Sequence, residues 1–184
     1  MSCSACHGQR GEGNEAMNAP KLAGQGDWYI QRQIQNYQRG IRGSHKDDTF
    51  GQQMASMTQI LSNPATLRDV AAYINTFEDT PVPKAIKGNT PKGASLYVTC
   101  GACHGRQGEG KFSLNAPRLA GQHDWYIKRQ LNNFKKGIRG THANDQYGKQ
   151  MILMAKMLTS EPACLYQHFL TPQSILQRTI EWNM

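Results

Sequence analysis

The stretch Cys3-Ser4-Ala5-Cys6-His7 decides the fold, and Cys100-Gly101-Ala102-Cys103-His104 repeats it. Two cysteines three residues apart, followed at once by a histidine, form the attachment pattern of a c-type haem. On one helical turn both thiols face the same way, so they can add to the two vinyl groups of one haem while the histidine ligates the iron. A zinc site would need further Cys or His ligands at similar spacing, and a thioredoxin-like redox pair would need a βαβ context. The sequence shows neither, so it predicts two covalent haems.

The two motifs belong to a long internal repeat. A single gapless offset of 97 residues pairs the halves from Cys3 with Cys100 as far as Leu61 with Leu158. Conversely, residues 80–91 contain three prolines and read as a linker. We therefore expect a first domain over residues 1–79 and a second over residues 92–184.

Within each half the periodicity is helical, and no stretch alternates as a strand would. Asp27 is the expected N-cap of a helix, and apolar residues follow it at spacings of three and four. Gly40 can adopt the left-handed conformation that ends such a helix. A further helix is expected to start at Ser62 or Asn63, with Pro64 in its first turn. The pattern predicts an all-α fold in which each domain wraps around one haem.

The second iron ligand is open to three interpretations. Methionines recur late in each half, where a loop can fold back over the haem, and a thioether ligand would raise the reduction potential. Position in the repeat favours Met54 and Met151 over Met57 and Met154. His45 and His142 also recur and are the competing ligands.

Other repeated residues are candidates for holding the haem. The carbonyls of Pro20 and Pro117, thirteen residues beyond each motif histidine, can accept its second ring N–H. Trp28 and Trp125, with their tyrosine neighbours, are expected to line the haem pocket. Arg42 and Arg139 read as propionate partners, as part of a docking face or, most simply, as solvated helix ends.

Charge and composition limit the classes of partner that this chain is expected to bind. The formal net charge is +8, but Lys and Arg are spread along the chain without the clustering of a nucleic-acid footprint. This balance favours redox proteins with acidic docking surfaces, or an anionic membrane surface. No apolar run approaches the length needed to cross a bilayer, and we expect no small-molecule substrate.

Both ends of the chain depart from the repeat. No leader precedes Cys3, although haem attachment takes place outside the cytoplasm, so a removed leader and a periplasmic location are expected. After Leu158 the expected helix does not recur, and Cys164 is left over from the two motifs.

Taken together, these motifs resemble the two-domain dihaem class I cytochromes c, of the cytochrome c-four kind. The resemblance rests on the paired Cys-Cys-His motifs, the Pro-x-Leu-Ala-Gly-Gln and Gly-Ile-Arg-Gly-x-His segments and the late methionines. It implies two small helical domains with His7 and His104 as proximal iron ligands and Met54 and Met151 as distal ones. It further implies an electron carrier, not an enzyme, between a quinol-oxidising complex or dehydrogenase and a terminal oxidase or reductase. The alternative is a haem subunit or catalytic cytochrome of a periplasmic oxidoreductase.

Overall fold

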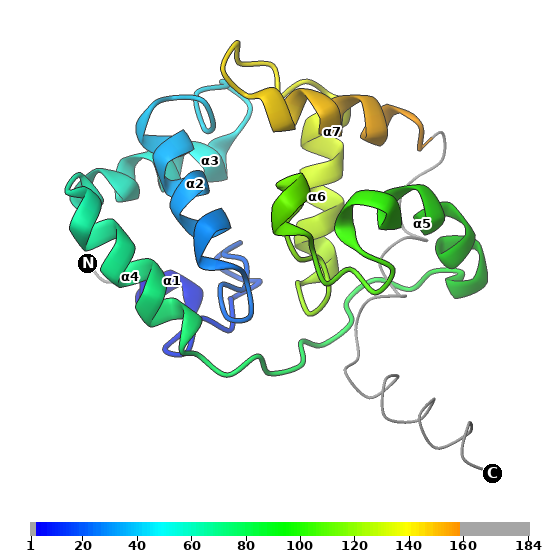
Figure 1. Ribbon diagram of the computed structural model, residues 1–184, viewed down its shortest axis with the longest axis horizontal. Coiled ribbons are helices and arrows are strands. Elements are labelled where there is room, and N and C mark those ends of the chain that lie inside the picture. Colours follow the sequence, from blue (N-terminus) through cyan, green and yellow to red (C-terminus); the bar gives the residue numbers. More distant parts are fainter. Residues whose placement is uncertain (1–2, 159–184) are drawn as a thin grey trace.

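The computed structural model describes residues 3–158, and these residues form helices and loops without a strand (Figure 1). Two isolated bridges, Asn14 with Ala19 and Lys111 with Ala116, close the same loop in each half. The predicted all-α class is confirmed for this part of the chain, whereas Cys164 lies outside it. The helices are α1 (Ser4–His7), α2 (Asp27–Gln38), α3 (Thr49–Thr58), η1 (Gln59–Leu61), α4 (Pro64–Asn75), α5 (Thr90–His104), η2 (Phe112–Leu114), α6 (Asp124–Lys135) and α7 (Gln146–Lys156).

The start and end of α2 agree with the sequence pattern apart from its cap. The helix begins at Asp27, but Gly26 is the capping residue, and the Asp27 carboxylate accepts a hydrogen bond from the Trp28 N–H at 2.7 Å. Beyond its C-terminus Gly40 has φ +65°, the left-handed conformation that a glycine adopts without strain. The repeat reproduces this helix as α6.

Helix α4 begins as its sequence predicts. Pro64 is its first residue, and the Asn63 side chain accepts a hydrogen bond from the Ala65 N–H at 2.8 Å. Its buried face packs on α2, with Ile30, Ala71 and Ile74 at the centre of this core. This packing holds the first half together beside its haem motif.

Helices α3 and α7 correct one expectation. The methionines near the end of each half lie on these helices, not on a loop that folds back. Both helices start at a buried aspartate whose carboxylate accepts a glycine N–H, from Gly51 to Asp48 at 3.1 Å and from Gly148 to Asp145 at 2.9 Å. The structure therefore presents each pair of methionines from a capped, regular helix.

Replacing Asp48 with Ala is expected to destabilise the first half by about 1–2 kcal/mol, because α3 loses its N-cap acceptor. Asp48→Asn keeps an acceptor oxygen and should lose much less. Denaturant unfolding of the haem-loaded protein, followed through the haem absorbance, measures both. Equal losses for the two variants would show that the cap is not the cause.

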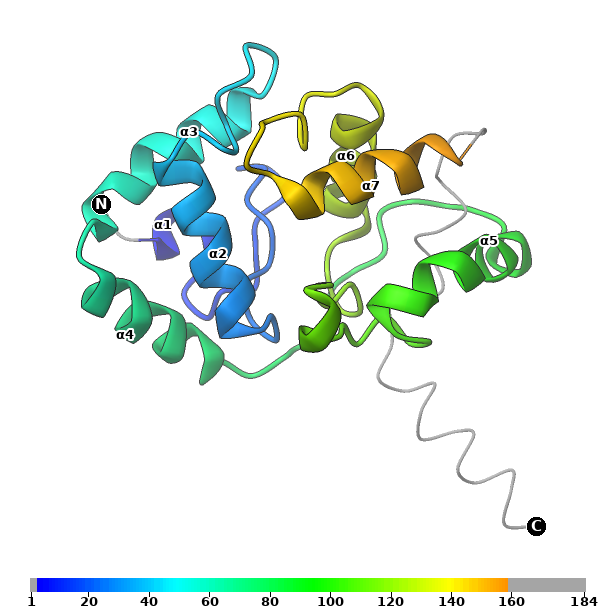
Figure 2. The ribbon, with the colours of Figure 1, turned by 45° about the horizontal axis from the view of Figure 1, so that its top comes forward.

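The two halves lie side by side, with α2 and α6 on the sides that face each other and α4 and α5 farther out (Figures 1 and 2). Residues 79–89 join them without forming a helix, and α5 begins at Thr90, inside the expected linker. Among the helices of the described residues, none has both the length and the apolar character needed to cross a membrane.

Candidate cofactor-binding site

Each Cys-Cys-His motif occupies a single helical turn. In the first half Cys3 caps α1, which contains Cys6 and His7, whereas the second motif ends the longer α5. All four cysteines are free thiols, and one in each pair, Cys3 and Cys103, is exposed. The thiols of each pair are thus available for two bonds to one ligand.

Both motif histidines are oriented by a backbone carbonyl. Nδ1 of His7 lies 2.7 Å from the Pro20 carbonyl oxygen, and Nδ1 of His104 lies 2.8 Å from that of Pro117. A ring whose Nδ1–H donates to a carbonyl keeps the lone pair on Nε2 for a metal. Burial lowers the pKa of both histidines, against the opposing effect of the prolyl carbonyl, and this favours the neutral, ligating form.

One continuous cavity of about 390 Å³ connects the two motifs, and apolar side chains from both halves dominate its lining. Both motif histidines and all four cysteines line it. So do the methionines of α3 and α7, Met54, Met57, Met151 and Met154.

The competing histidines are elsewhere. His45 and His142 are absent from the lining, and each Nδ1 accepts an N–H from its own loop, from Asp47 and Asn144 respectively, at 3.1 Å. The structure therefore brings methionines, and not these histidines, together with the motifs.

The lining also corrects the expectation for the tryptophans. Tyr29 and Tyr126 line the cavity, whereas Trp28 and Trp125 do not. The Trp28 ring instead packs edge-on against Phe112 of the other half, 5.4 Å between ring centroids.

Arg42 and Arg139 are not solvated helix ends. Both line the cavity, and Arg42 is 6% exposed. In the described residues neither has an acidic partner, and the Nε atom of each is buried without an acceptor. Two cations on the lining that lack an acidic partner, each with a buried Nε–H to donate, fit the carboxylate groups of a haem. The residues present therefore fit two haem groups, each with cysteines, an oriented histidine and a nearby methionine.

The contact between the halves is built from reciprocal pairs. Arg42 donates to the Tyr126 hydroxyl at 2.9 Å and to Gln130 Oε1 at 2.9 Å, and Arg139 donates to the Tyr29 hydroxyl at 3.2 Å and to Gln33 Oε1 at 2.8 Å. Each contact is related to its counterpart by the offset of 97. The two halves thus meet in a pseudo-twofold interface, as in an isologous dimer.

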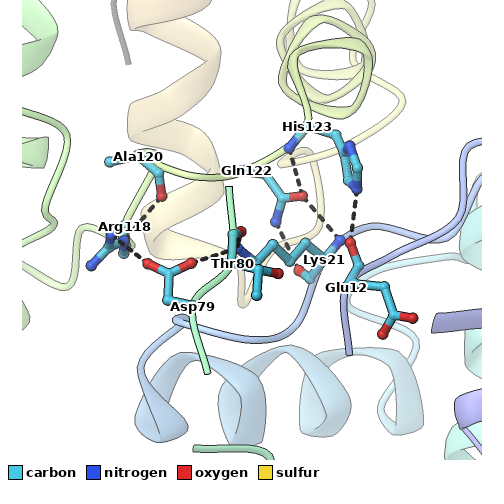
Figure 3. A network of polar contacts seen from close by, with 8 residues as sticks. All are labelled: Glu12, Lys21, Asp79, Thr80, Arg118, Ala120, Gln122 and His123. Carbon is cyan, nitrogen blue, oxygen red and sulfur yellow. Dashed lines mark hydrogen bonds and ion pairs between the residues drawn. The ribbon is translucent and has the colours of Figure 1, made fainter. Parts of the chain in front are cut away.

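Outside this network the symmetry is broken at Asp79 (Figure 3). Its carboxylate pairs with Lys21, whose side chain is 1% exposed, at 2.5 Å, and with the counterpart residue Arg118 at 2.7 Å. His123, which replaces Gly26 of the first half, bonds through Nε2 to the Glu12 carbonyl at 2.9 Å. The Asp79 contacts hold the chain just before the linker against both halves, and the His123 contact joins the two halves directly.

Comparison with known proteins agrees with this site. The family model for cytochrome c matches residues 1–78 and 91–175. Cytochrome c4 of Azotobacter vinelandii is 36% identical over 162 residues, covering 82% of this chain and 73% of the relative. A thiosulfate dehydrogenase electron acceptor of Stutzerimonas stutzeri is 29% identical, covering 80% and 69%.

Among solved structures, that of reduced recombinant cytochrome c4 from Pseudomonas stutzeri superposes with a TM-score of 0.67 at 28% identity, covering 91% of this chain and 93% of that one. Two cytochrome c domains imply two covalently bound haem c groups and an electron-transfer function. The chain belongs to the cytochrome c family, as a dihaem member similar to cytochrome c4.

Proposed function

We propose that this protein carries single electrons in the periplasm between a respiratory donor, either a quinol-oxidising complex or a dehydrogenase, and a terminal oxidase or reductase. Its partners are redox proteins, and the net charge of +8 favours partners with acidic docking surfaces. We place the domain boundaries at residues 1–79 and 92–184, with residues 80–91 between them.

In this proposal each domain holds its haem through four kinds of residue. Cys3 and Cys6, and likewise Cys100 and Cys103, form the thioether bonds, and His7 and His104 bind the irons. Met54 and Met151 are the distal ligands, and Arg42 and Arg139 neutralise haem carboxylates. The bound haem supplies a one-electron iron couple.

The protein's own residues set the conditions for that couple. The prolyl carbonyls hold each imidazole in one tautomer, which makes it the better electron donor to the metal. The apolar lining excludes water, and a thioether on the far side stabilises the ferrous state. One observation carries the proposal. In each half, an oriented histidine and a pair of methionines line the same cavity.

A carrier role is favoured over catalysis because a histidine and a methionine together would fill both axial positions of each iron. The relative named as a thiosulfate dehydrogenase electron acceptor supports a second candidate, in which this chain takes electrons directly from a dehydrogenase as its haem subunit. This second candidate differs from the first only in the electron donor, and the haem-binding residues are the same in both.

A spectroelectrochemical titration of the haem-loaded protein tests the proposal. We expect two one-electron steps and, in the oxidised protein, the weak absorption band of a sulfur–iron bond. Carbon monoxide should bind slowly, if at all, to the reduced protein. Rapid, stoichiometric binding at one haem would contradict the carrier role and support a catalytic cytochrome.

A further inference from the structure

In each half a short loop holds the motif histidine at two points. The N–H of Gly13 donates to the His7 carbonyl at 2.8 Å, and the Pro20 carbonyl oxygen lies 2.7 Å from Nδ1 of His7. The second half has the same two contacts, at 2.7 and 2.8 Å. We call residues 13–21 and 110–118 the histidine loops. The position of each histidine loop decides how its prolyl carbonyl meets the imidazole.

Two residues before each of these prolines, the histidine loop takes a strained backbone conformation. Asn18 has φ 53° and Asn115 has φ 54°, the only positive values among the non-glycine residues in the described part of the chain. The left-handed region is costly for a residue with a side chain, although asparagine tolerates it better than most. Such a conformation persists where the surrounding structure holds it in place. Each histidine loop therefore depends on contacts at its asparagine.

An arginine of the opposite domain supplies these contacts. Nη1 and Nη2 of Arg32 donate to the side-chain oxygen and the carbonyl oxygen of Asn115, each at 2.9 Å. Arg129 binds the same two oxygens of Asn18, each at 2.8 Å. A planar guanidinium binds two acceptors at once in a fixed geometry, which a lysine ammonium does not reproduce. Each arginine thus holds the strained residue of a histidine loop across the domain interface.

Aromatic rings from both domains hold each arginine in position. The Arg32 guanidinium lies 4.9 Å from the centroid of the Trp28 ring, in its own domain, and 4.7 Å from that of Tyr147, in the other. Arg129 has the same setting, with the Phe50 ring of the first domain 4.6 Å away. A guanidinium over an aromatic face is attracted to the ring. Both arginines are therefore preorganised toward the opposite histidine loop.

A glutamine of the opposite domain holds the other side of each prolyl carbonyl. Gln25 accepts the Arg118 N–H at 3.2 Å and donates its side-chain amide to the Arg118 carbonyl at 3.0 Å. Gln122 makes the same two contacts with the Lys21 backbone, at 3.1 and 2.8 Å (Figure 3). Arg118 and Lys21 directly follow the two prolines. Each prolyl carbonyl thus lies between two contacts that the opposite domain makes.

We call each arginine with its glutamine, Arg32 with Gln25 and Arg129 with Gln122, a crossed clamp. We propose that each crossed clamp positions the prolyl carbonyl of the opposite domain, and through it sets the hydrogen bond of that domain's motif histidine. The proposal rests on the function proposed above, in which these histidines bind the irons. An imidazole whose N–H donates a stronger hydrogen bond is a better electron donor and stabilises ferric iron. Each domain therefore helps to set the reduction potential of the other domain's haem.

The partners of the crossed clamps favour a positioning role over simple adhesion between the domains. Arg42 and Arg139 also cross the interface, but they bind tyrosine and glutamine side chains of α2 and α6. The crossed clamps instead bind backbone atoms of the two loops that carry the histidine contacts. Contacts that served adhesion alone would change the stability of the protein when removed, and would leave each histidine hydrogen bond as it was.

The test breaks one crossed clamp at a time in the haem-loaded protein, as Gln25→Ala/Arg32→Met and as Gln122→Ala/Arg129→Met. Arg32→Lys keeps the positive charge but loses the fork, so it separates positioning from electrostatics. The control, Arg39→Met, removes a charge at an exposed position just beyond α2. Nuclear magnetic resonance of the reduced protein measures solvent exchange of each histidine Nδ1–H. Spectra recorded during a redox titration give the potential of each haem separately.

We expect the variant without the Arg32 clamp to exchange the Nδ1–H of His104 about tenfold faster, because its hydrogen bond opens more often. Reduction of the second haem should become more favourable by about threefold in its equilibrium constant, less than the effect of removing a ligand's direct partner. His7 and the first haem should not change measurably. The variant without the Arg129 clamp should give the reverse pattern, and Arg39→Met should give neither. Arg32→Lys should act in the same direction as the loss of the whole clamp.

Two kinds of result would overturn the proposal. One is an equal change at both haems in both clamp variants, or a change confined to the haem of the altered domain. The other is unchanged exchange of the histidine Nδ1–H in both variants, which would leave the clamps an adhesive role alone. A reduced protein in which neither histidine ring N–H is shifted by a haem would refute the ligand assignment of the proposed function, a result separate from the crossed pattern.

Discussion

Replacing Met151 with His is expected to lower the reduction potential of one haem by on the order of 100 mV or more, since axial ligands set haem potentials over a range of about 0.8 V. A thioether favours ferrous iron, and a second imidazole favours ferric iron. Met151 lines the cavity from α7, a helix capped by a buried aspartate, so the new imidazole starts from a well-defined position. The other haem should keep its potential, and the sulfur–iron absorption band should fall by half.

The control is Met154→His on the same helix. Met154 also lines the cavity, so the two variants differ mainly in which residue reaches the iron. A large potential shift in the Met154 variant, with little in the Met151 variant, would show that Met154 and not Met151 is the iron ligand. Met54 and Met57 on α3 form the matched pair for the first domain. Potentiometric titration of all four variants tests the ligand assignment.

The contact between each motif histidine and its proline could be predicted because it is encoded by type and spacing. Pro20 follows His7, and Pro117 follows His104, at the same distance in both copies of the repeat. The structure has both contacts, at 2.7 and 2.8 Å. Such a contact can be predicted because its two residues lie only thirteen positions apart and the histidine ring N–H needs an acceptor when it is buried.

Helix α3 was missed because its sequence is weakly periodic. Gln52, Gln53 and Ser56 interrupt the apolar pattern, and the two methionines alone do not define a face. The available signal was Asp48, whose carboxylate caps the helix by accepting the Gly51 N–H. This signal is ambiguous in the sequence, because an aspartate shortly before a glycine is also common in turns and loops. Helical order here depends on the cap and on packing against α2.

The interface was missed for a different reason. Its residues are arginines, glutamines and tyrosines, which a single copy of the sequence assigns to solvent. Yet Gln33 recurs as Gln130 and Tyr29 as Tyr126, and polar residues without a local task rarely recur in both copies of a duplicated unit. Repetition of such residues was the signal, and it indicates a surface that the two copies bury against each other.

Replacing Arg42 with Met is expected to destabilise the protein by about 2–4 kcal/mol, because a buried network loses its central donor. The Arg42 guanidinium donates to Gln33 of its own domain at 2.8 Å, and to Tyr126 and Gln130 of the other domain. Although burial raises the pKa of Tyr126, the charges of Arg42 and Arg139 outweigh that effect and hold it below its ordinary value. The Tyr126 hydroxyl therefore interacts favourably with the neighbouring arginines.

Arg39→Met is the matched control, since Arg39 lies three residues earlier and is exposed. It should cost less than about 0.5 kcal/mol, as most exposed substitutions do. A double-mutant cycle with Tyr126→Phe, followed by denaturant unfolding of the haem-loaded protein, isolates the contact between the domains and should give a coupling energy of about 1 kcal/mol. If Arg42→Met costs no more than Arg39→Met, the network does not hold the domains together. If the cost is large but the coupling is zero, Arg42 acts within its own domain, and the reciprocal contacts are a consequence of domain packing and not its cause.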